Sequence, residues 1–444
     1  MSYLKARGDE PNTLLLDQGD TWQETLYSAY NQGHLITDVM NYVQFDARTI
    51  GNHDFDWGVK VLQDNTERDY NGYSTPVLGA NIFEYDNDLK TITSRQCSEL
   101  GTTSVTYTLE NGLKVGIVGV IGEDQYTSIS SNIVKDVAFK DHISVIKSEA
   151  TKLRENGCDV VICSAHTGQD SLTGNNLSNY VDLVLCGHTH RDEHTTEGNL
   201  FYGQYGCDGQ KFGHVTLTYD YGQKKVVSTS SDTLDRYDIS TSIDPQIQAI
   251  CDPYFAEVQE VASIKYLKNK TQYFSRSAMA RLMCEAMYEQ AVVEGYDVYG
   301  AMCNEARDYI SANRQWTYED IFDCFPFNNE VLIMDVKGDE LQNELAWNPL
   351  YRAPAHISDP VPLDTGSTRI AVIDYVGYHQ NTARSYNYFP YGALHVVGTL
   401  SVNYRDCLIN YLLRHNYDTG GTLDASRYAD GTSASEFSTS LNYI

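Results

Sequence analysis

The sequence predicts a layered α/β domain followed by a mixed α+β region. In the first half of the chain, apolar runs typical of buried strands end abruptly in polar residues that can bind a ligand. Helical stretches alternate with these runs, as is typical of an α/β fold. From about Thr233 the composition changes to charged segments whose apolar residues recur at helical spacing. We therefore expect two different domains joined by a helical connector.

The first half contains strand-like runs that end in candidate ligands. These are "TLLLDQGD", ending at Asp20, "DVVICSAHTG", ending in the region of His166, and "VDLVLCGHTH", carrying His188 and His190. "TPVLGANI" and "GLKVGIVGVIG" are further predicted strands. "KDHISVIKSEATKLRENG" is predicted to be a helix, because Ile143, Ile146 and Leu153 suit one face. Open α/β sheets place their sites at the carboxyl ends of strands, where these polar residues fall.

The second half begins with the connector "SIDPQIQAICDPYFAEVQEVASIKYLKNK". The next predicted helix, "RSAMARLMCEAMYEQAVVEG", has an apolar stripe formed by Met279, Leu282, Met283, Ala286 and Met287. "NEVLIMDVKG" and "RIAVIDYVGY" are predicted strands, and the tail "TLDASRYADGTSASEFSTS" is expected to lie on the surface or fray. We expect a first domain over residues 1–232, a helical linker over 233–274 and a second domain over 275–444.

Composition limits the classes of partner. The 444 residues include 60 acidic and 32 basic side chains, for a net charge of -28, which disfavours binding to nucleic acid polymers and anionic membrane surfaces. No apolar run approaches the roughly 18 residues that span a bilayer, and the N-terminal segment lacks the apolar core of a secretory signal. The 10 cysteines show no regular spacing and are expected to be buried free thiols.

Five residues at the ends of predicted strands are candidate metal ligands. Asp20, Asn52, His166, His188 and His190 offer the oxygen and nitrogen donors that suit Zn, Mn or Fe. Taken alone, a Gly-Asp pair after a strand is more typical of a turn. The four clusters "GD", "GNHD", "SAHTG" and "GHTH" in one order favour a metal centre, and two ions about 3.5–4 Å apart could act together on a phosphoryl ester.

These motifs resemble the signature of the calcineurin-like metallophosphoesterases. "NEARDYI" and "FPFNNEVLIMDVKGDELQ" resemble the C-terminal domain of the secreted 5'-nucleotidases and UDP-sugar hydrolases, and the resemblance extends from Pro11 to about Asn416. It implies a β-sandwich flanked by helices (αββα) followed by an α+β domain. It also implies two divalent cations and hydrolysis of phosphoesters by a metal-bound hydroxide.

The resemblance also implies roles for the turn "GNHDFDWG". Asn52 corresponds to a metal ligand, and His53 to the residue that stabilises the transition state and assists the leaving group. Asp56 corresponds to the carboxylate that orients His53, as a His–Asp pair requires. Asp54 is expected not to be a ligand.

The chain departs from the family pattern at its start. The resemblance implies an Asp-x-His motif on an earlier strand, and nothing before Thr13 supplies it, so an N-terminal truncation or a wrongly assigned start is expected. Asp20, Asn52, His166 and His188 would then furnish a nearly complete second-metal site. The first site would keep only His190 and the bridging Asp20, and activity should be weak.

The C-terminal motifs imply a substrate site. Asn304 and Arg307 in "CNEARD" correspond to a phosphate-binding stretch whose glycines this chain lacks, and Phe327, Asn328 and Asn329 correspond to a region that borders the pocket. Arg307 could clamp a phosphate with two hydrogen bonds. The alternative is a surface Arg paired with one of the many carboxylates.

An aromatic cluster is a candidate platform for a nucleobase. Tyr386, Tyr388, Phe389 and Tyr391 could stack on a base. With 34 Tyr in the chain, ordinary packing is the alternative.

The resemblance thus implies a 5'-nucleotidase-type hydrolase of nucleotide phosphomonoesters or 2',3'-cyclic nucleotides. One alternative is a truncated or non-catalytic relative that binds nucleotides. Another is a hydrolase of UDP-sugars or thiosulfate-type esters. The resemblance implies a secreted, periplasmic or cell-surface protein, which the missing signal does not support, and the oligomeric state is left open.

Overall fold

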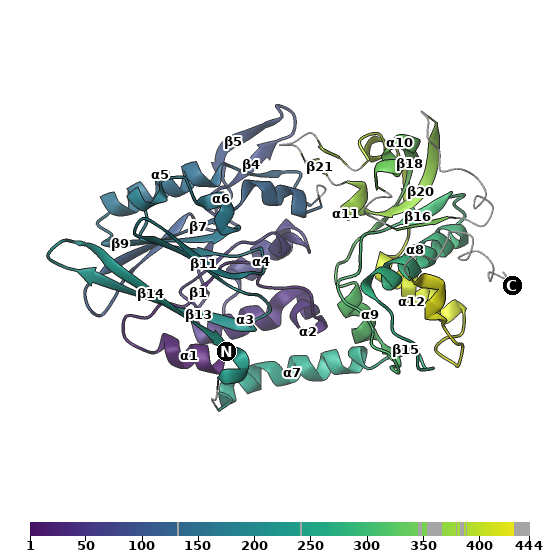
Figure 1. Ribbon diagram of the computed structural model, residues 1–444, viewed down its shortest axis with the longest axis horizontal. Coiled ribbons are helices and arrows are strands. Elements are labelled where there is room, and N and C mark those ends of the chain that lie inside the picture. The colour runs from purple at the N-terminus through teal and green to yellow at the C-terminus, as the bar shows by residue number, and fades with distance from the viewer. Residues whose placement is uncertain are drawn as a thin grey trace. The chain divides into compact units, whose positions relative to one another are not determined.

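The computed structural model describes residues 1–130, 133–239, 242–344, 349–352, 366–378, 380–381, 386–387 and 389–429. These residues form two units (Figure 1). The first consists of Met1–Gln23, Tyr30–Ile129 and Ile133–Tyr254, and the second is built mainly from Phe255 onward together with Glu24–Ala29. Helix α7 (Pro245–Ala262) carries the chain from the first unit into the second. The domain boundaries expected at residues 232 and 274 remain predictions.

The first unit is built around two sheets. The smaller is a parallel sheet with the order β1-β2-β3, formed by β1 (Leu16–Asp17), β2 (Ala47–Thr49) and β3 (Val77–Leu78). The larger has the order β11-β12-β10-β9-β7-β6, formed by β6 (Ser104–Thr108), β7 (Lys114–Ile121), β9 (Val160–His166), β10 (Leu183–Cys186), β11 (Asp192–Glu197) and β12 (Leu200–Tyr205). Strands β7, β9, β10 and β12 run parallel.

The two sheets share one hydrophobic core, to which Ala47 and Leu78 contribute from the small sheet and Ile117 and Ile162 from the large one. The opposite face of the large sheet packs against α5 (His142–Glu155) through residues such as Ile146. Because β7 and β9 are covered on both faces, their sequences are almost continuously apolar.

Helix α3 (His34–Val43) packs beside the small sheet, in a core that also contains Leu15 and Ile250. The order of layers in the first unit is therefore helix, sheet, sheet and helix, and the predicted αββα architecture is confirmed. The predicted helix of the "KDHISVIKSEATKLRENG" segment is α5, and the Asp141 side chain caps it by accepting a hydrogen bond from the Ser144 amide at 2.8 Å.

The remaining elements of the first unit lie around these layers. A third sheet has the order β5-β4-β8, from β4 (Ile82–Asp86), β5 (Thr91–Gln96) and β8 (Val137–Phe139), and a long hairpin pairs β13 (Lys211–Asp220) with β14 (Lys225–Asp235). The other helices are α1 (Ser2–Gly8), α4 (Val59–Glu67) and α6 (Gln169–Leu172), with 3-10 turns η1 (Tyr30–Gly33), η2 (His53–Phe55), η3 (Glu123–Ser128), η4 (Leu177–Asn179) and η5 (Arg236–Asp238).

The second unit is an α+β structure around a mixed sheet with the order β19-β16-β20-β18-β23. Its strands are β16 (Gly300–Met302), β18 (Val331–Lys337), β19 (Leu350–Arg352), β20 (Ser367–Ile373) and β23 (Val396–Thr399). Helix α8 (Arg276–Val293) lies in the core of this unit and packs against α12 (Tyr404–Arg414). Every residue of the predicted stripe on α8 is fully buried: Met279, Leu282, Met283, Ala286 and Met287.

Short elements complete the second unit. They are β15 (Lys265–Leu267) paired with β17 (Trp316–Thr317), β21 (Gln380–Asn381) paired with β22 (Tyr386–Asn387), α2 (Leu26–Ala29), α9 (Tyr318–Cys324), α10 (Gly338–Glu344), α11 (Asp374–Gly377), η7 (Gly392–Leu394) and η8 (Ala425–Tyr428).

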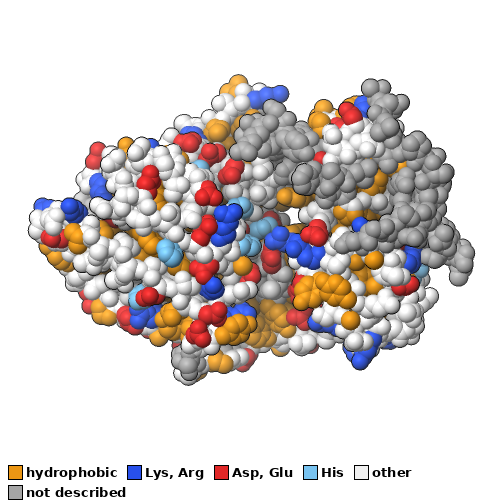
Figure 2. Space-filling view, viewed as in Figure 1, with side chains coloured by type: hydrophobic (Ala, Val, Ile, Leu, Met, Phe, Trp, Pro, Cys, Tyr) orange, Lys and Arg blue, Asp and Glu red, His pale blue; other side chains and the backbone are white. Residues whose placement is uncertain are grey.

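Charged side chains are visible on the surface (Figure 2), and most of the cysteines are buried, as the sequence led us to expect for the thiols. Asp and Glu side chains are spread over the visible face, with Lys and Arg among them (Figure 2). All ten cysteines are free; eight are buried, and Cys207 and Cys251 are partly exposed. Among the helices of the described residues, none has the length and apolar character needed to cross a membrane.

Candidate metal centre

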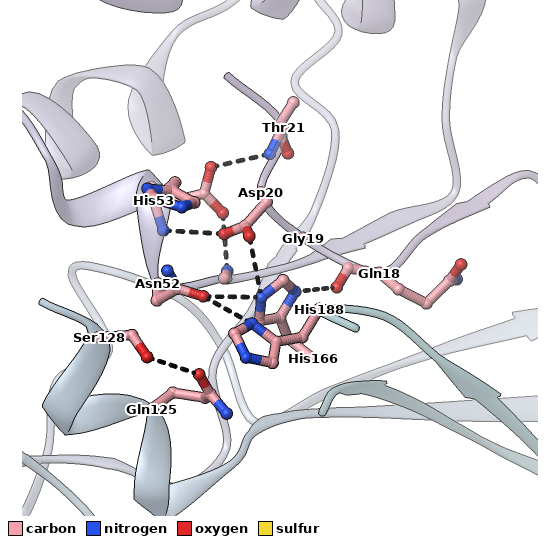
Figure 3. A network of polar contacts seen from close by, with 12 residues as sticks. Gln18, Gly19, Asp20, Thr21, Asn52, His53, Gln125, Ser128, His166 and His188 are labelled. Carbon is pink, nitrogen blue, oxygen red and sulfur yellow. Dashed lines mark hydrogen bonds and ion pairs between the residues drawn. The ribbon is translucent and has the colours of Figure 1, made fainter. Parts of the chain in front are cut away.

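The candidate ligands lie where parallel strands of the two sheets end. Asp20 follows β1 and Asn52 follows β2, while His166 is the last residue of β9 and His188 comes two residues after β10. Since these strands run parallel within each sheet and the sheets pack together, their carboxyl ends meet at one edge. Figure 3 shows the four side chains pointing toward one another.

Two glycines allow the turns to approach closely. A Cβ on Gly19, whose φ is +92°, would lie 2.7 Å from the Gly51 nitrogen, and a Cβ on Gly51 would lie 2.2 Å from Asp20 Oδ1. Asp20 and His188 adopt left-handed backbone conformations with φ of 55° and 71°. Such conformations cost free energy for residues other than glycine and are concentrated at functional sites.

Four donor atoms converge on one point. The Oδ1 atom of Asn52 lies 3.1 Å from His166 Nε2 and 3.0 Å from His188 Nδ1, and His166 Nε2 lies 3.2 Å from Asp20 Oδ2. Within the part of the chain that the structure describes, Asp20, His166 and His188 are the only group of three or more His, Cys, Asp or Glu side chains found to be arranged for an ion. Two imidazoles, a carboxylate and an amide oxygen suit Zn, Mn or a similar cation.

The hydrogen bonds of His166 test whether a cation fits. Its Nδ1 lies 2.7 Å from the Gln18 carbonyl oxygen, so Nδ1 is assigned as the atom that carries and donates the ring proton. In the neutral ring Nε2 is then an acceptor that faces the acceptor oxygens of Asn52 and Asp20. Acceptors gathered around one point repel each other unless a proton or a cation lies between them, so the residues fit a metal ion.

The electrostatics of the donors favour a positive charge at this point. Burial lowers the pKa of His166, but Asp20 outweighs it and raises this pKa, so that a proton on Nε2 takes the position of the cation when no ion is bound. Burial lowers the pKa of His188 to about 4, and His166 adds to the effect, so His188 is neutral at physiological pH and can bind a metal. Burial alone would raise the pKa of Asp20, but the histidines His166 and His53 outweigh it and hold this pKa well below its usual range. Asp20 is therefore an anion.

His53 and Asp56 form a pair beside these donors. His53 Nδ1 lies 2.8 Å from Asp56 Oδ2, which also accepts a hydrogen bond from Gln23 Nε2 at 3.0 Å. The backbone amide of His53 donates to Asp20 Oδ1 at 2.8 Å. Burial lowers the pKa of His53, but Asp56 and then Asp20 outweigh it and raise the pKa to about 9. The neighbouring carboxylates thus favour the protonated form of the His53 imidazole.

Asp54, which is expected not to be a ligand, contacts the backbone of the turns rather than the donor atoms. It is buried, and its Oδ1 accepts from the Thr21 amide at 3.1 Å while its Oδ2 accepts from the Gly51 amide at 2.7 Å. Asp54 therefore ties the turn that carries Asp20 to the turn that carries Asn52. Sequence reasoning missed this role.

Arg48 on β2 is a second feature that sequence reasoning missed. Its guanidinium is buried, lies 4.3 Å from the centre of the Trp22 ring and interacts electrostatically with Asp54 and Asp17. The only signal was an Arg in an otherwise uncharged strand, "ARTI". A buried cation here offsets the negative charge of the two carboxylates.

The structure does not bring His190 into the donor cluster. His190 is exposed, with a left-handed φ of 59°, and it is absent from the group formed by Asp20, His166 and His188. Its assignment as a metal ligand remains a prediction.

In the second unit, Arg307 forms an ion pair with Glu24 and lies 5.6 Å from the centre of the Phe327 ring. Asn304 and Asn329 are partly buried and Asn328 is exposed. Arg307 is thus paired with a carboxylate, and its assignment as a phosphate clamp remains a prediction.

The loop of Phe327 and Asn328 is held by a residue that the sequence did not reveal. Arg405 on α12 is buried and donates hydrogen bonds to the carbonyl oxygens of Phe325, Pro326 and Phe327 at 2.7–2.8 Å. Its Nη2 also lies 3.4 Å from Asn328 Oδ1.

The proposed aromatic platform needs correction. Phe389 is fully buried in the core of the second unit, so for this residue the alternative of ordinary packing holds. Tyr391 stacks on His395 with ring centres 3.6 Å apart. Tyr388 and the side chain of Tyr386 lie outside the described residues.

Two protein-family models match the chain. A model of the calcineurin-like phosphoesterases matches residues 3–192, and a model of the 5'-nucleotidase C-terminal domain matches residues 255–406. The first of these models identifies the N-terminal part of the chain as a calcineurin-like metallophosphoesterase domain. With its C-terminal domain, the chain belongs to the 5'-nucleotidase family of these hydrolases.

Curated relatives carry the same family name. The venom 5'-nucleotidase of Naja atra is 25% identical over 378 residues, which cover 76% of this chain and 68% of that protein. Human 5'-nucleotidase is 26% identical over 382 residues, which cover 76% of this chain and 63% of that protein. The chain spans about two thirds of the length of these relatives.

Solved structures share the fold. A 5'-nucleotidase precursor from Thermus thermophilus has a TM-score of 0.67 at 18% identity, covering 93% of this chain and 89% of that one. The sulfate thiohydrolase SoxB of Thermus thermophilus has a TM-score of 0.67 at 15% identity, covering 95% of this chain and 79% of that one.

Proposed function

We propose that this chain hydrolyses nucleotide phosphomonoesters with the help of a divalent cation, with 2',3'-cyclic nucleotides as a second substrate class. The observation that carries the proposal is the convergence of four donor atoms beside a His–Asp pair. A cation can activate water and a neighbouring proton donor can protonate the leaving oxygen, which together allow cleavage of a phosphoester.

Asp20, Asn52, His166 and His188 are proposed to hold the cation. When bound, such an ion polarises a phosphoryl oxygen and lowers the pKa of water, so that water becomes a nucleophile near neutral pH. The Gln18 carbonyl fixes the ring of His166 through Nδ1, which leaves Nε2 for the ion.

His53 is proposed to give a proton to the leaving oxygen of the nucleoside. With its pKa raised to about 9 by Asp56 and Asp20 against the effect of burial, the imidazole is charged at neutral pH. Asp56 fixes the ring through Nδ1, so that Nε2–H is the group available to the substrate. Gln23 in turn holds Asp56.

Arg307 is proposed to bind the nucleotide phosphate, with Asn304, Phe327, Asn328 and Asn329 around it. The guanidinium is already paired with Glu24, so a phosphate would have to replace this carboxylate. A doubly charged phosphate that accepts two parallel hydrogen bonds can compete with a singly charged carboxylate for the guanidinium.

The second candidate function is nucleotide binding without turnover. It is favoured by the exposed position of His190, which leaves one donor cluster among the described residues. A single ion cannot clamp both the attacking and the leaving oxygen as a pair of ions does.

The test is phosphate release from AMP, 2',3'-cyclic AMP and a UDP-sugar by protein loaded with Mn or Zn. We expect release from AMP, and we expect His53→Ala to lower turnover by roughly 100-fold or more while metal content stays the same. His214→Ala, which removes an exposed imidazole from the β13–β14 hairpin, is the matched control. Full turnover by His53→Ala would refute the role of His53, and AMP binding without release would favour the second candidate.

A further inference from the structure

Two cysteines of the second unit lie in contact. Cys284 is in the middle of α8, and Cys303 directly follows β16. Their sulfur atoms are 3.5 Å apart, and their side chains are 0% and 1% exposed. The pair therefore lies inside the hydrophobic core rather than at its surface.

The contact is particular to these two residues. All ten cysteines are described, and no second pair of cysteine sulfurs lies within hydrogen-bonding distance. Cys163 and Cys186 show the contrast, because they lie on the neighbouring strands β9 and β10 but are out of register. Cys163 is opposite Val184 and Cys186 is opposite Ala165.

Weak interactions hold the two thiols where they are. Cys284 Sγ lies 3.3 Å from the Pro349 carbonyl oxygen, and Cys303 Sγ lies 3.4 Å from the Ala280 carbonyl oxygen. Thiols are weak donors, so these contacts cost little to give up. A disulfide needs the sulfurs to come about 1.5 Å closer, to a bond length of about 2.05 Å.

We propose that Cys284 and Cys303 are joined by a disulfide when the chain folds in the presence of a disulfide oxidant. The thiolate of one cysteine attacks a sulfur of the oxidant and releases one thiol, leaving a mixed disulfide. The thiolate of the second cysteine then attacks the protein sulfur of that bond and releases the second thiol. The protein loses two S–H hydrogens and gains one S–S bond, and the oxidant is reduced to two thiols.

Burial determines when this bond forms. Exchange requires a thiolate that the oxidant can reach. In the folded unit, the hydrogen bond to Cys284 and then burial raise the pKa of Cys303 well above its usual value. We therefore expect oxidation before the core closes, and resistance to reduction afterwards.

The bond would tie α8 to the segment that begins the Asn304–Arg307 loop. The two cysteines are 19 positions apart, so the bond would close a loop of intermediate length and restrict the unfolded chain. The second unit should then unfold at higher denaturant concentration, and the residue before Asn304 would be fixed to the core.

The test is to refold the reduced full chain with oxidised glutathione and to count thiols after denaturation, with a peptide map under non-reducing conditions. Ten cysteines less the two in the bond should leave eight titratable thiols, and the map should contain one linked peptide pair, Cys284 with Cys303. Ten thiols, or links between other cysteines, would overturn the proposal. This result does not depend on whether the chain hydrolyses nucleotides.

Two variants sharpen the test. Cys303→Ser should show nine thiols under both conditions, whereas the control Cys163→Ser should show seven after oxidation and nine after reduction. The urea midpoint of the second unit should be higher for oxidised than for reduced protein, and this difference should vanish in Cys303→Ser. If Cys303→Ser does not fold, the peptide map of the unsubstituted chain still decides the question.

Discussion

Among single residues, Asp54 links the two turns that carry Asp20 and Asn52. Its two oxygens accept hydrogen bonds from the amides of Thr21 and Gly51, the residues next to Asp20 and Asn52. A carboxylate can accept on both sides, whereas an amide side chain would present a donor to one of these two N–H groups. We therefore expect that a carboxylate at position 54, and not only a side chain of the same shape, is needed to accept both hydrogen bonds.

We predict that Asp54→Asn weakens Mn²⁺ binding by roughly 10- to 100-fold, as is typical when a group that orients metal ligands is lost. Calorimetric titration of metal-free protein measures this. Asp56→Asn is the matched control, because Asp56 contacts the side chains of His53 and Gln23 rather than the backbone of the ligand turns. It should lower turnover and leave Mn²⁺ affinity nearly unchanged; equal affinities for both variants would contradict the role of Asp54.

The sequence revealed the donors of this centre but not their supports. Asp20, Asn52, His166 and His188 could be found because each follows a strand-like run beside glycine or in a known motif. Asp54 and Arg48 could not be assigned, because their roles depend on which backbone amides and carboxylates surround them in three dimensions. His190 shares the "GHTH" motif with His188, and both have a left-handed backbone. His188 is partly buried in the donor cluster, whereas His190 is exposed.

At the scale of elements, α8 illustrates what hydrophobic periodicity can predict. The residues of its predicted stripe are fully buried, but so are Ala280 and Cys284, and Glu285 is also 0% exposed. The helix is surrounded by the core of its unit rather than lying on a surface. Periodicity identified one face, and only the packing shows that the other faces are covered as well.

Truncating this helix core should be costly. Met283 is fully buried on α8, so Met283→Ala should lower the free energy of unfolding of the second unit by roughly 2–5 kcal/mol. Val293, the last residue of the same helix, is 59% exposed, and Val293→Ala should change it by less than about 0.5 kcal/mol. Urea unfolding of the two variants gives the comparison, and similar losses for both would show that α8 is not packed as described.

Asp374, the first residue of α11, makes the stability of the second unit depend on pH. Burial raises its pKa from the ordinary 3.8 to about 7, against the effect of a hydrogen bond from the Tyr375 amide. The folded state therefore binds a proton that the unfolded state releases at lower pH. The contribution of the protonated Asp374 side chain to stability is fully present below pH about 4 and is lost as the pH rises toward 7.

We predict that Asp374→Asn stabilises the second unit relative to the unsubstituted protein at pH 8 but not at pH 4. The difference should be roughly 1–3 kcal/mol, since one pKa unit corresponds to about 1.4 kcal/mol and the side chain is partly exposed. Urea midpoints at the two pH values measure it, and a difference that is the same at both would rule out a protonated Asp374.

At the scale of the whole molecule, the two-domain α/β and α+β architecture followed from the sequence because strand and helix patterns alternate in the first half and change after Thr233. The aromatic region did not follow, since composition cannot separate a core Phe389 from an exposed platform. The net charge of -28 repels nucleotides as it repels polymers. We therefore expect binding of a phosphate to rely on local cations, for which the proposed metal ion and Arg307 are the candidates.

We propose that a cation held by Asp20, Asn52, His166 and His188 is required for phosphate release. The most direct measurement is AMP hydrolysis by EDTA-treated protein during stepwise addition of Mn²⁺, with bound metal determined on the same samples. Turnover should be absent without metal and rise as the first equivalent binds, and Asn52→Ala should need far more Mn²⁺ for the same rate. Full turnover by metal-free protein, or an Asn52→Ala titration that matches the unsubstituted protein, would contradict the account.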